Sequence, residues 1–250
     1  NFDAYRVNPP LVRMVATLPL LLASPRVDWA VSQAGPPYRP EWQMGPQMIS
    51  LNGPSAFRYF WLARWASIPF SLLGGWICFR WATDLYGPTS GLLALILWCS
   101  CPMVLGHGQL LTPDVGAAAC GVAAGYLFWR WLCEPVWPRA FAAGLTLGLA
   151  ELTKFTWIIL FGLWPLLWLV WQIRPRVVGG KRDWRRQVPQ SAMILTVTLA
   201  VINLGYGFER TGTRLRDFQF VSQTLRGPSH EPGQAGFAVG NRFGESWLGC

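Results

Sequence analysis

Asp114 stands in a short polar gap between two long apolar segments. It ends the stretch His107-Gly-Gln-Leu-Leu-Thr-Pro-Asp114, and neither residues 89–106 before the gap nor residues 115–129 after it carry a charge. A carboxylate at bilayer depth costs about 2.5–3.5 kcal/mol, so an acid held between two membrane spans is a candidate functional group. Such an acid could act as a general base on an acceptor hydroxyl or amine, or could bind a divalent cation.

Lys154 and Arg13 add positive charge that could neutralise a phosphate. Lys154 closes the polar interruption Glu151-Leu-Thr-Lys inside the apolar stretch 140–171, and Arg13 ends the motif Asn8-Pro-Pro-Leu-Val-Arg. A cation beside a departing phosphate stabilises the charge that develops there. Together with the acid, these side chains suit displacement at a carbon that bears a lipid-linked phosphate.

Each candidate also has a purely structural explanation. Asp114 would be favoured by the helix dipole in the first turn of a helix. Lys154 could extend toward lipid headgroups, or could pair with Glu151 on one helix face. His107, between two glycines, could be a polar turn residue, and Arg13 could bind anionic lipid without any chemistry. The residue types alone leave these alternatives open.

The composition indicates an integral membrane protein. Of the 250 residues, 52% are hydrophobic and only 13% are charged, whereas a soluble domain has roughly 25% charged residues. The 16 Trp are typical of membrane–water interfaces. The six Cys have neither zinc-site nor disulfide-framework spacing, and the basic residues form no stripe suited to nucleic acid. We therefore expect no nucleic-acid partner.

Apolar runs long enough to cross about 30 Å of hydrocarbon predict an all-α, polytopic bundle of membrane helices. Four runs are clear, at residues 60–81, 89–106, 115–133 and 188–206. The stretch 140–171 is expected to form two short helices that turn at the polar tetrad, rather than one long tilted helix with an extended Lys154. The chain then has about six crossings.

The distribution of Lys and Arg predicts the orientation. With residue 1 outside, nine basic residues fall on the inner loops, at 80–88, 130–139 and 173–187. The short outer turns carry one, Lys154. This asymmetry places Lys154, Asp114 and His107 together on the non-cytoplasmic face.

Three regions are expected along the chain. Residues 1–57 form an outer-face loop with an interfacial helix that begins at the Pro pair. Residues 58–206 form the transmembrane helical domain, and residues 207–250 begin an outer-face loop or domain that is truncated. Because the chain begins with Asn1 in polar sequence, we expect it to be a fragment or a processed form of a longer protein.

Four motifs, in this order, resemble the membrane glycosyltransferases of the GT-C type. They are Asn8-Pro-Pro-Leu-Val-Arg, Ala82-Thr-Asp-Leu-Tyr-Gly-Pro, Gly106-His-Gly-Gln-Leu-Leu-Thr-Pro-Asp and Ala143-Gly-Leu-Thr-Leu-Gly-Leu-Ala-Glu-Leu-Thr-Lys-Phe. The chain is most similar to the bacterial branch related to protein O-mannosyltransferases and lipid A aminoarabinose transferases. The resemblance covers residues 5–155 and, more loosely, Gly240-Asn-Arg-Phe-Gly-Glu-Ser-Trp.

The resemblance implies transfer of a sugar from a polyprenyl-phosphate carrier to a protein, lipid or glycan acceptor. It further implies a bacterial inner-membrane enzyme whose site faces the periplasm or exterior and which inverts the anomeric centre by direct displacement. Asp114 matches the assisting acid of the second outer loop, whereas the principal base would precede Asn1, so the fragment alone is expected to be inactive. Lys154 matches a residue near the donor phosphate.

The remaining predicted binding residues for the donor phosphate or the substrate are His107, Gln109, Asn8 and Arg13. Asn8 departs from the family pattern, because relatives commonly have His or Lys before the Pro pair, and a neutral Asn adds no charge. No cofactor is predicted with certainty. A divalent cation is left open, since Asp114 and His107 are too few ligands for a site.

Two functions of other classes are alternatives. A transporter or flippase of a lipid-linked sugar would place ionisable residues near mid-membrane and would often show internal repeats. Here the polar residues collect at one face and no repeat is evident. A non-catalytic membrane scaffold is the other alternative. The sequence identifies neither the sugar nor the acceptor.

Overall fold

The computed structural model describes residues 8–30, 40–173, 184–209, 211–218, 225 and 240–243. These residues are predominantly helical, and the prediction of an all-α chain is confirmed. The chain divides into two compact units, which we describe separately. One unit, the helical bundle, comprises Tyr5–Pro25 and Pro54–Gly207 and contains every candidate site residue, whereas the other comprises Asn1–Ala4, Arg26–Gly53 and Phe208–Cys250.

Helices joined by short turns build the bundle. In chain order they are α1 (Leu11–Ala23), α3 (Ser55–Trp65), α4 (Ile68–Tyr86), α5 (Pro88–Ser100), α6 (Pro102–Gly108), α7 (Pro113–Cys133), α8 (Trp137–Glu151), the 3-10 helix η3 (Phe155–Ile158), α9 (Ile159–Ile173) and α10 (Trp184–Gly205). Each helix from α4 to α8 has a proline in its first two positions. A proline there loses no intrahelical hydrogen bond, and so the prolines define where these helices begin.

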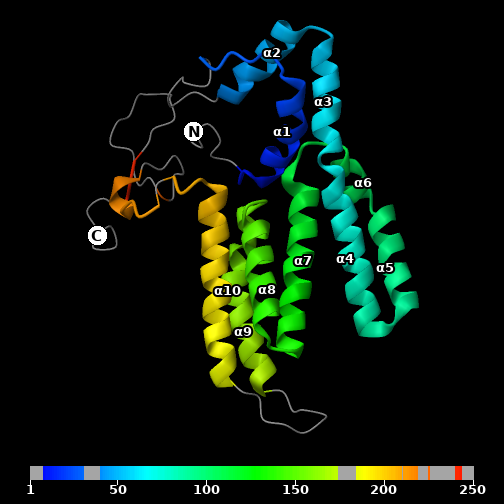
Figure 1. The fold of residues 1–250 in the computed structure, drawn as a ribbon, viewed down its shortest axis with the longest axis vertical. Coiled ribbons are helices and arrows are strands. Elements are labelled where there is room, and N and C mark those ends of the chain that lie inside the picture. The colour runs from blue at the N-terminus through cyan, green and yellow to red at the C-terminus, as the bar shows by residue number, and fades with distance from the viewer. Residues whose placement is uncertain are drawn as a thin grey trace. The chain divides into compact units, whose positions relative to one another are not determined.

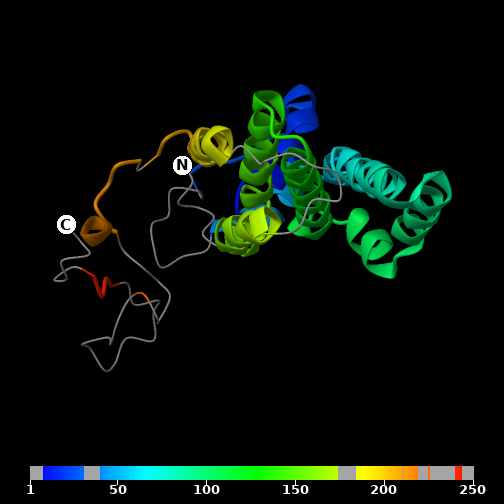
Figure 2. The same ribbon diagram turned by 90° about the horizontal axis from the view of Figure 1, so that it is seen from below.

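The helices pack in an order that follows the chain. Helix α5 packs on α4, α4 on α7, α7 on α8, and α8 on α10, while α1 packs on α3. In Figure 1 the long helices of the bundle run side by side. Figure 2, which looks along them, shows α5 at one edge of the bundle, with α4 between it and α7. Helix α7 therefore lies inside the bundle and α5 at its margin.

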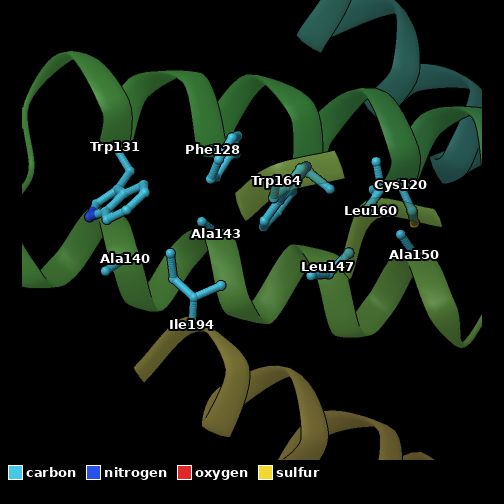
Figure 3. Close-up of a cluster of buried hydrophobic side chains, with 11 residues drawn as sticks. Cys120, Phe128, Trp131, Ala140, Ala143, Leu147, Ala150, Leu160, Trp164 and Ile194 are labelled. Carbon is cyan, nitrogen blue, oxygen red and sulfur yellow. The ribbon is translucent and has the colours of Figure 1, made fainter. Parts of the chain in front are cut away.

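The core lies between α7, α8, α9 and α10, as Figure 3 shows. The rings of Phe128 and Trp164 stack with their centroids 4.2 Å apart. The buried indole of Trp131 donates a hydrogen bond of 2.8 Å to Oε1 of Gln190, so the polar end of this large side chain is satisfied. Aromatic side chains bury large apolar areas, and this cluster accordingly fixes how α9 and α10 lie on α7 and α8.

Small residues bring α8 and α10 into backbone contact. A Cβ atom at Gly144 would lie 2.7 Å from the carbonyl oxygen of Ile194, and one at Gly148 would lie 2.7 Å from Cβ of Val201. The buried hydroxyl of Thr198 donates to the carbonyl oxygen of Gly144 at 3.0 Å. This is the packing that membrane helices use, in which small residues permit close approach and a hydroxyl bridges the two backbones.

The stretch 140–171 forms two helices, as predicted. Helix α8 ends at Glu151, and η3 begins at Phe155. Between them Lys154 has extended backbone, with φ −158° and ψ 127°. The backbone amide of Leu11 donates to the carbonyl oxygen of Leu152 at 3.0 Å and so holds the start of α1 against this turn.

Only some of the six predicted crossings have the length and hydropathy expected of a membrane span. Three helical segments of the described chain do so by length and composition: Ser55–Tyr86, Phe155–Ile173 and Trp184–Gly205. Helices α5 and α6, bent by 54° relative to each other, make a fourth if they are counted as one span. Helix α7 is rich in Ala and Gly and is enclosed by other helices, so it need not present an apolar surface to lipid, and α8 has only 15 residues.

The other unit contains α2 (Pro40–Asn52) and the short 3-10 helix η4 (Leu215–Asp217). Asn52 exchanges two hydrogen bonds with the backbone of Arg26, of 2.9 and 2.8 Å. The side-chain amide of Asn241, in the tail motif, donates to the carbonyl oxygens of Leu215, Arg216 and Phe218. Residues 174–183 of the predicted basic loop, and the end of the tail motif after residue 243, lie outside the described residues.

Candidate functional site

Asp114 and Lys154 form an ion pair between two turns of the bundle. The ammonium Nζ of Lys154 lies 3.0 Å from Oδ1 of Asp114, within hydrogen-bond distance. Asp114 follows Pro113 in the first turn of α7, where the helix dipole favours an acid. Lys154 lies where the chain leaves α8, and its extended backbone directs the side chain away from that helix. Both side chains are 38% exposed, so the pair remains accessible.

His107 completes the cluster from the end of α6. Its Nδ1 lies 3.4 Å from Oδ2 of Asp114 and 3.3 Å from the hydroxyl oxygen of Thr112. Lysine and histidine thus approach different oxygens of one carboxylate. The arrangement leaves both a cation and an imidazole beside a single acid, which is a set of groups that can hold an anion and accept or donate a proton.

Lys154 holds Asp114 in its ionised form. The hydrogen bond from Lys154 is the largest cause that lowers the pKa of Asp114 below its usual value. Partial burial opposes this effect. The charge of Lys154, the Thr112 hydroxyl and the charge of His107 act in the same direction as the hydrogen bond. Asp114 is accordingly a carboxylate at neutral pH, ready to accept hydrogen bonds.

The structure places the other predicted residues around this cluster. Asn8 is half-buried and precedes the buried Pro pair, and the segment that it begins docks on the Lys154 turn through the bond from Leu11 to Leu152. Arg13 lies within electrostatic reach of Tyr206, the residue after α10. Gln109 is exposed. The motif at residues 8–13 and the turn at 151–154 are therefore neighbours in space, although 140 positions separate them in the sequence.

The suggested pairing of Glu151 with Lys154 is wrong. Lys154 pairs with Asp114 instead, and Glu151 is only 4% exposed. Its Oε1 has no hydrogen-bond partner among the described residues. The i,i+3 rule assumes a continuous helix, but here the helix ends at Glu151 and the two side chains diverge.

An apolar cavity of about 780 Å³ adjoins the cluster, and the sequence did not predict it. It opens between α3–α4 and α5–α6, and its walls include Gly108 and Gln109, the two residues after His107. Three indoles line it, those of Trp61, Trp65 and Trp98. The indole N–H of Trp98 donates to the carbonyl oxygen of Ser71 at 3.0 Å, which fixes one wall. The abundance of Trp was the available signal, but nothing in the sequence showed that these three converge.

Metal-ligand residue types are few at the cluster. Within the described part of the chain, no group of three or more His, Cys, Asp or Glu side chains is arranged to hold a metal ion. Asp114 and His107 are the two residues of those types in the cluster. The chemistry that the described side chains themselves supply is thus that of a carboxylate, an ammonium and an imidazole.

Comparison with known proteins identifies a family. The sequence model of the family described as dolichyl-phosphate-mannose-protein mannosyltransferase matches residues 57–206. The matched region contains Asp114, His107 and Lys154, and it begins after the motif at residues 8–13. Neither a curated protein nor a solved structure matches the chain significantly.

Proposed function

Because the chain belongs to the dolichyl-phosphate-mannose-protein mannosyltransferase family, we propose that this membrane glycosyltransferase moves a sugar from a polyprenyl-phosphate carrier to an acceptor on the non-cytoplasmic face. The observation that carries the proposal is the Asp114–Lys154 ion pair, which lies beside His107 inside the matched region. The excess of basic residues on the opposite loops supports the orientation. A bacterial inner membrane, with the site facing the periplasm, is the proposed location.

Lys154 is proposed to bind the donor phosphate. In the free site its charge is shared with Asp114, at 3.0 Å. A donor phosphate would compete for the ammonium and take up its charge as the bond between the sugar carbon and the phosphate oxygen breaks. Arg13 and Asn8, whose segment docks on the same turn, would add a second charge and an amide on that side.

Asp114 is proposed to assist the attacking group. Once Lys154 binds phosphate, the carboxylate is free to accept a hydrogen bond from a hydroxyl of the acceptor or of the sugar. The acceptor oxygen then forms its bond to the anomeric carbon as the phosphate departs, and the configuration inverts. The acceptor proton passes to a carboxylate base, which the family resemblance assigns to another outer loop.

The apolar cavity is proposed to receive part of the carrier chain. Its indole-lined walls end at Gly108 and Gln109, next to His107. An isoprenoid chain in this cavity would bring its phosphate toward the charged cluster, because apolar pockets with a few polar groups at one end fix the orientation of a ligand. Gln109 would then contact the head of the donor.

The proposal is tested with full-length protein in native membranes and a polyprenyl-phosphate sugar as donor. Asp114→Asn keeps the shape but removes the charge, and we expect transfer to fall by about 10²–10⁴-fold. Glu134→Gln is the matched control, since this acid is 62% exposed and lies at the far end of α7. Undiminished transfer by Asp114→Asn would refute the role of that acid. Movement of the lipid-linked sugar across vesicles without transfer to any acceptor would instead favour a flippase.

A further inference from the structure

The end of the bundle opposite the Asp114 cluster carries a group of aromatic rings. Trp81 of α4 and Tyr126 and Trp129 of α7 lie with their ring centroids 6.0, 6.1 and 6.3 Å apart. The guanidinium carbon of Arg130 lies 5.7 Å from the centre of the Tyr126 ring. A cation at this distance from an aromatic face is held by the ring quadrupole. We call this group the aromatic–arginine cluster; Figure 1 shows the two helices that carry it.

The acids around the cluster are already engaged. The hydroxyl of Tyr126 donates to Oδ2 of Asp84 at 2.7 Å, and Arg80 lies 3.9 Å from the other oxygen of that carboxylate. Glu134 is paired with Arg139 at 2.6 Å. These contacts neutralise Arg80 and Arg139, and among the residues that the structure describes they leave no carboxylate near the cluster for Arg130.

Two hydrogen-bond donors next to the Tyr126 ring have no acceptor. Among the described residues, the buried indole nitrogen of Trp81 has no hydrogen-bond partner. In the same part of the chain, the half-buried guanidinium of Arg130 has its ring contact and no carboxylate partner. A buried donor without a partner costs about 1–3 kcal/mol, and a guanidinium is built to donate two parallel hydrogen bonds to an oxyanion. The cluster thus offers several N–H groups and one unbalanced positive charge.

We propose that the aromatic–arginine cluster binds the phosphate of an anionic phospholipid headgroup. The phosphate would accept from the Arg130 guanidinium and from the Trp81 indole and would balance the unpaired charge. A lipid is the occupant that fits the surroundings, because α4 exposes apolar side chains on both sides of Trp81, such as Trp76 at 57% and Leu85 at 45%. Basic pockets between membrane helices on the cytoplasmic side commonly bind such headgroups. This site is separate from sugar transfer and does not depend on it.

The proposal differs from simple extension of an arginine to the interface. An arginine that only extends to the interface would also attract anionic lipid, but its binding of lipid would not need the N–H of Trp81. A phosphate site formed by Arg130 and Trp81 prefers an anionic headgroup with no competing ammonium, and it requires both donors.

The experiment uses the full-length protein in detergent, with lipid binding followed by native mass spectrometry. Phosphatidylglycerol and phosphatidylcholine are compared, and inorganic phosphate is added in a separate arm. We expect tighter binding of phosphatidylglycerol and a loss of about tenfold in its affinity with Arg130→Gln, as for one charge-assisted hydrogen bond. Trp81→Phe keeps a ring but removes the N–H, and about a threefold loss is expected. Arg58→Gln, at an exposed arginine of α3, is the matched control and should leave binding unchanged.

Three outcomes would overturn the proposal. They are equal binding of the two lipids, unchanged phosphatidylglycerol affinity in Arg130→Gln, and displacement of phosphatidylglycerol by inorganic phosphate at similar concentration, which would indicate a soluble-anion site. Trp81→Phe guards against a folding defect, because without added lipid it removes an unpaired buried donor and its thermal unfolding midpoint should be no lower than that of the unaltered protein. Both variants should still transfer sugar in membranes. Weaker lipid binding with normal sugar transfer therefore concerns this proposal alone, whereas loss of transfer in the unaltered protein would concern the proposed function.

Discussion

Helices α7 and α5 sit very differently within one bundle. More than half of the residues of α7 are buried, whereas Gly91 is the one buried residue of α5, all of which the structure describes. Four large side chains of α5 are between 54% and 61% exposed: Leu92, Leu93, Ile96 and Leu97. In a membrane such side chains face lipid, so α5 is held mainly from one side, by α4, while α7 is held from several sides.

The close contacts at Gly144 and Gly74 differ in kind. Between α8 and α10, a Cβ at Gly144 would meet backbone atoms of Ile194. Between α4 and α5, a Cβ at Gly74 would meet the ring of Trp98 first, which also lines the cavity, whereas one at Gly91 would meet the carbonyl oxygen of Phe79 at 2.8 Å. The backbone contact at Gly144 therefore makes the α7–α8–α10 region rigid there, whereas the cavity wall at Gly74 can adjust through a side chain. The rigid region supplies Asp114 and Lys154, so the charges stay in place while the cavity beside them can adapt to a ligand.

The largest expected effect tests whether the rigid region carries the chemistry. Lys154→Met removes the cation and keeps the chain length, and we expect sugar transfer to fall by about 10²–10³-fold, as for loss of one preorganised electrostatic group. Lys154→Arg keeps the charge and should recover part of the rate. Steady-state transfer in membranes, measured at equal protein abundance, checks both. A Met variant that is as active as the unaltered protein would remove Lys154 from the site.

A smaller effect tests the backbone contact itself. Gly144→Ala places a Cβ 2.7 Å from the Ile194 carbonyl oxygen, and we expect a loss of about 2 kcal/mol in the free energy of unfolding, within the range for overpacking. Gly162→Ala in α9 is the matched control. Nothing lies within 4 Å of its Cβ position, so it should stabilise by about 0.5–1 kcal/mol. Denaturant titration in detergent measures the difference. Equal stability of the two variants would contradict a rigid backbone contact between α8 and α10.

Gly74→Ala is the corresponding change in the adjustable region. Its Cβ would overlap the Trp98 ring, more closely than any contact at Gly144. The ring can move toward the cavity at the expense of its hydrogen bond to the Ser71 carbonyl oxygen, so we expect a loss of only about 1 kcal/mol, with a changed tryptophan emission spectrum. A loss greater than that of Gly144→Ala would abolish the contrast between the two regions.

The sequence predicted the helices better than their bends. The uncharged residues 89–106 predict one span, yet the chain bends between Ser100 and Pro102, and Cys101 has ψ 119°. A residue before proline disfavours the α conformation, so the signal was present and was outweighed by the uninterrupted apolar run. The break at residues 151–154 was predicted correctly, because four residues that include Glu and Lys interrupt an otherwise apolar stretch.

The sequence identified Asp114 and Lys154 but not their contact. Forty positions separate them, and only the packing of α7 on α8 brings the two turns together. The distribution of Lys and Arg over the loops could place both residues at one face of the membrane. It predicts their depth in the membrane but not which residues they contact. The cavity was out of reach for the same reason, since its indoles come from α3 and α5.

The smallest expected effect concerns the pH dependence of the ion pair. The pKa of Asp114 is lowered in the folded chain, chiefly by the hydrogen bond from Lys154. The stabilisation is thus fully present above the unfolded pKa of about 3.9 and is lost as the pH falls through the folded pKa. With both side chains 38% exposed, solvent screening limits this stabilisation to about 0.5 kcal/mol.

A double-mutant cycle of Asp114→Asn and Lys154→Met isolates the coupling between the two residues, because all other titrating groups cancel. The coupling should be constant from pH 7 to about pH 5 and should disappear only as the pH falls through the lowered pKa of Asp114 in the folded chain. A coupling that instead grew on acidification would mean that Lys154 does not hold the charge of Asp114, and that the two residues are neighbours without being a pair.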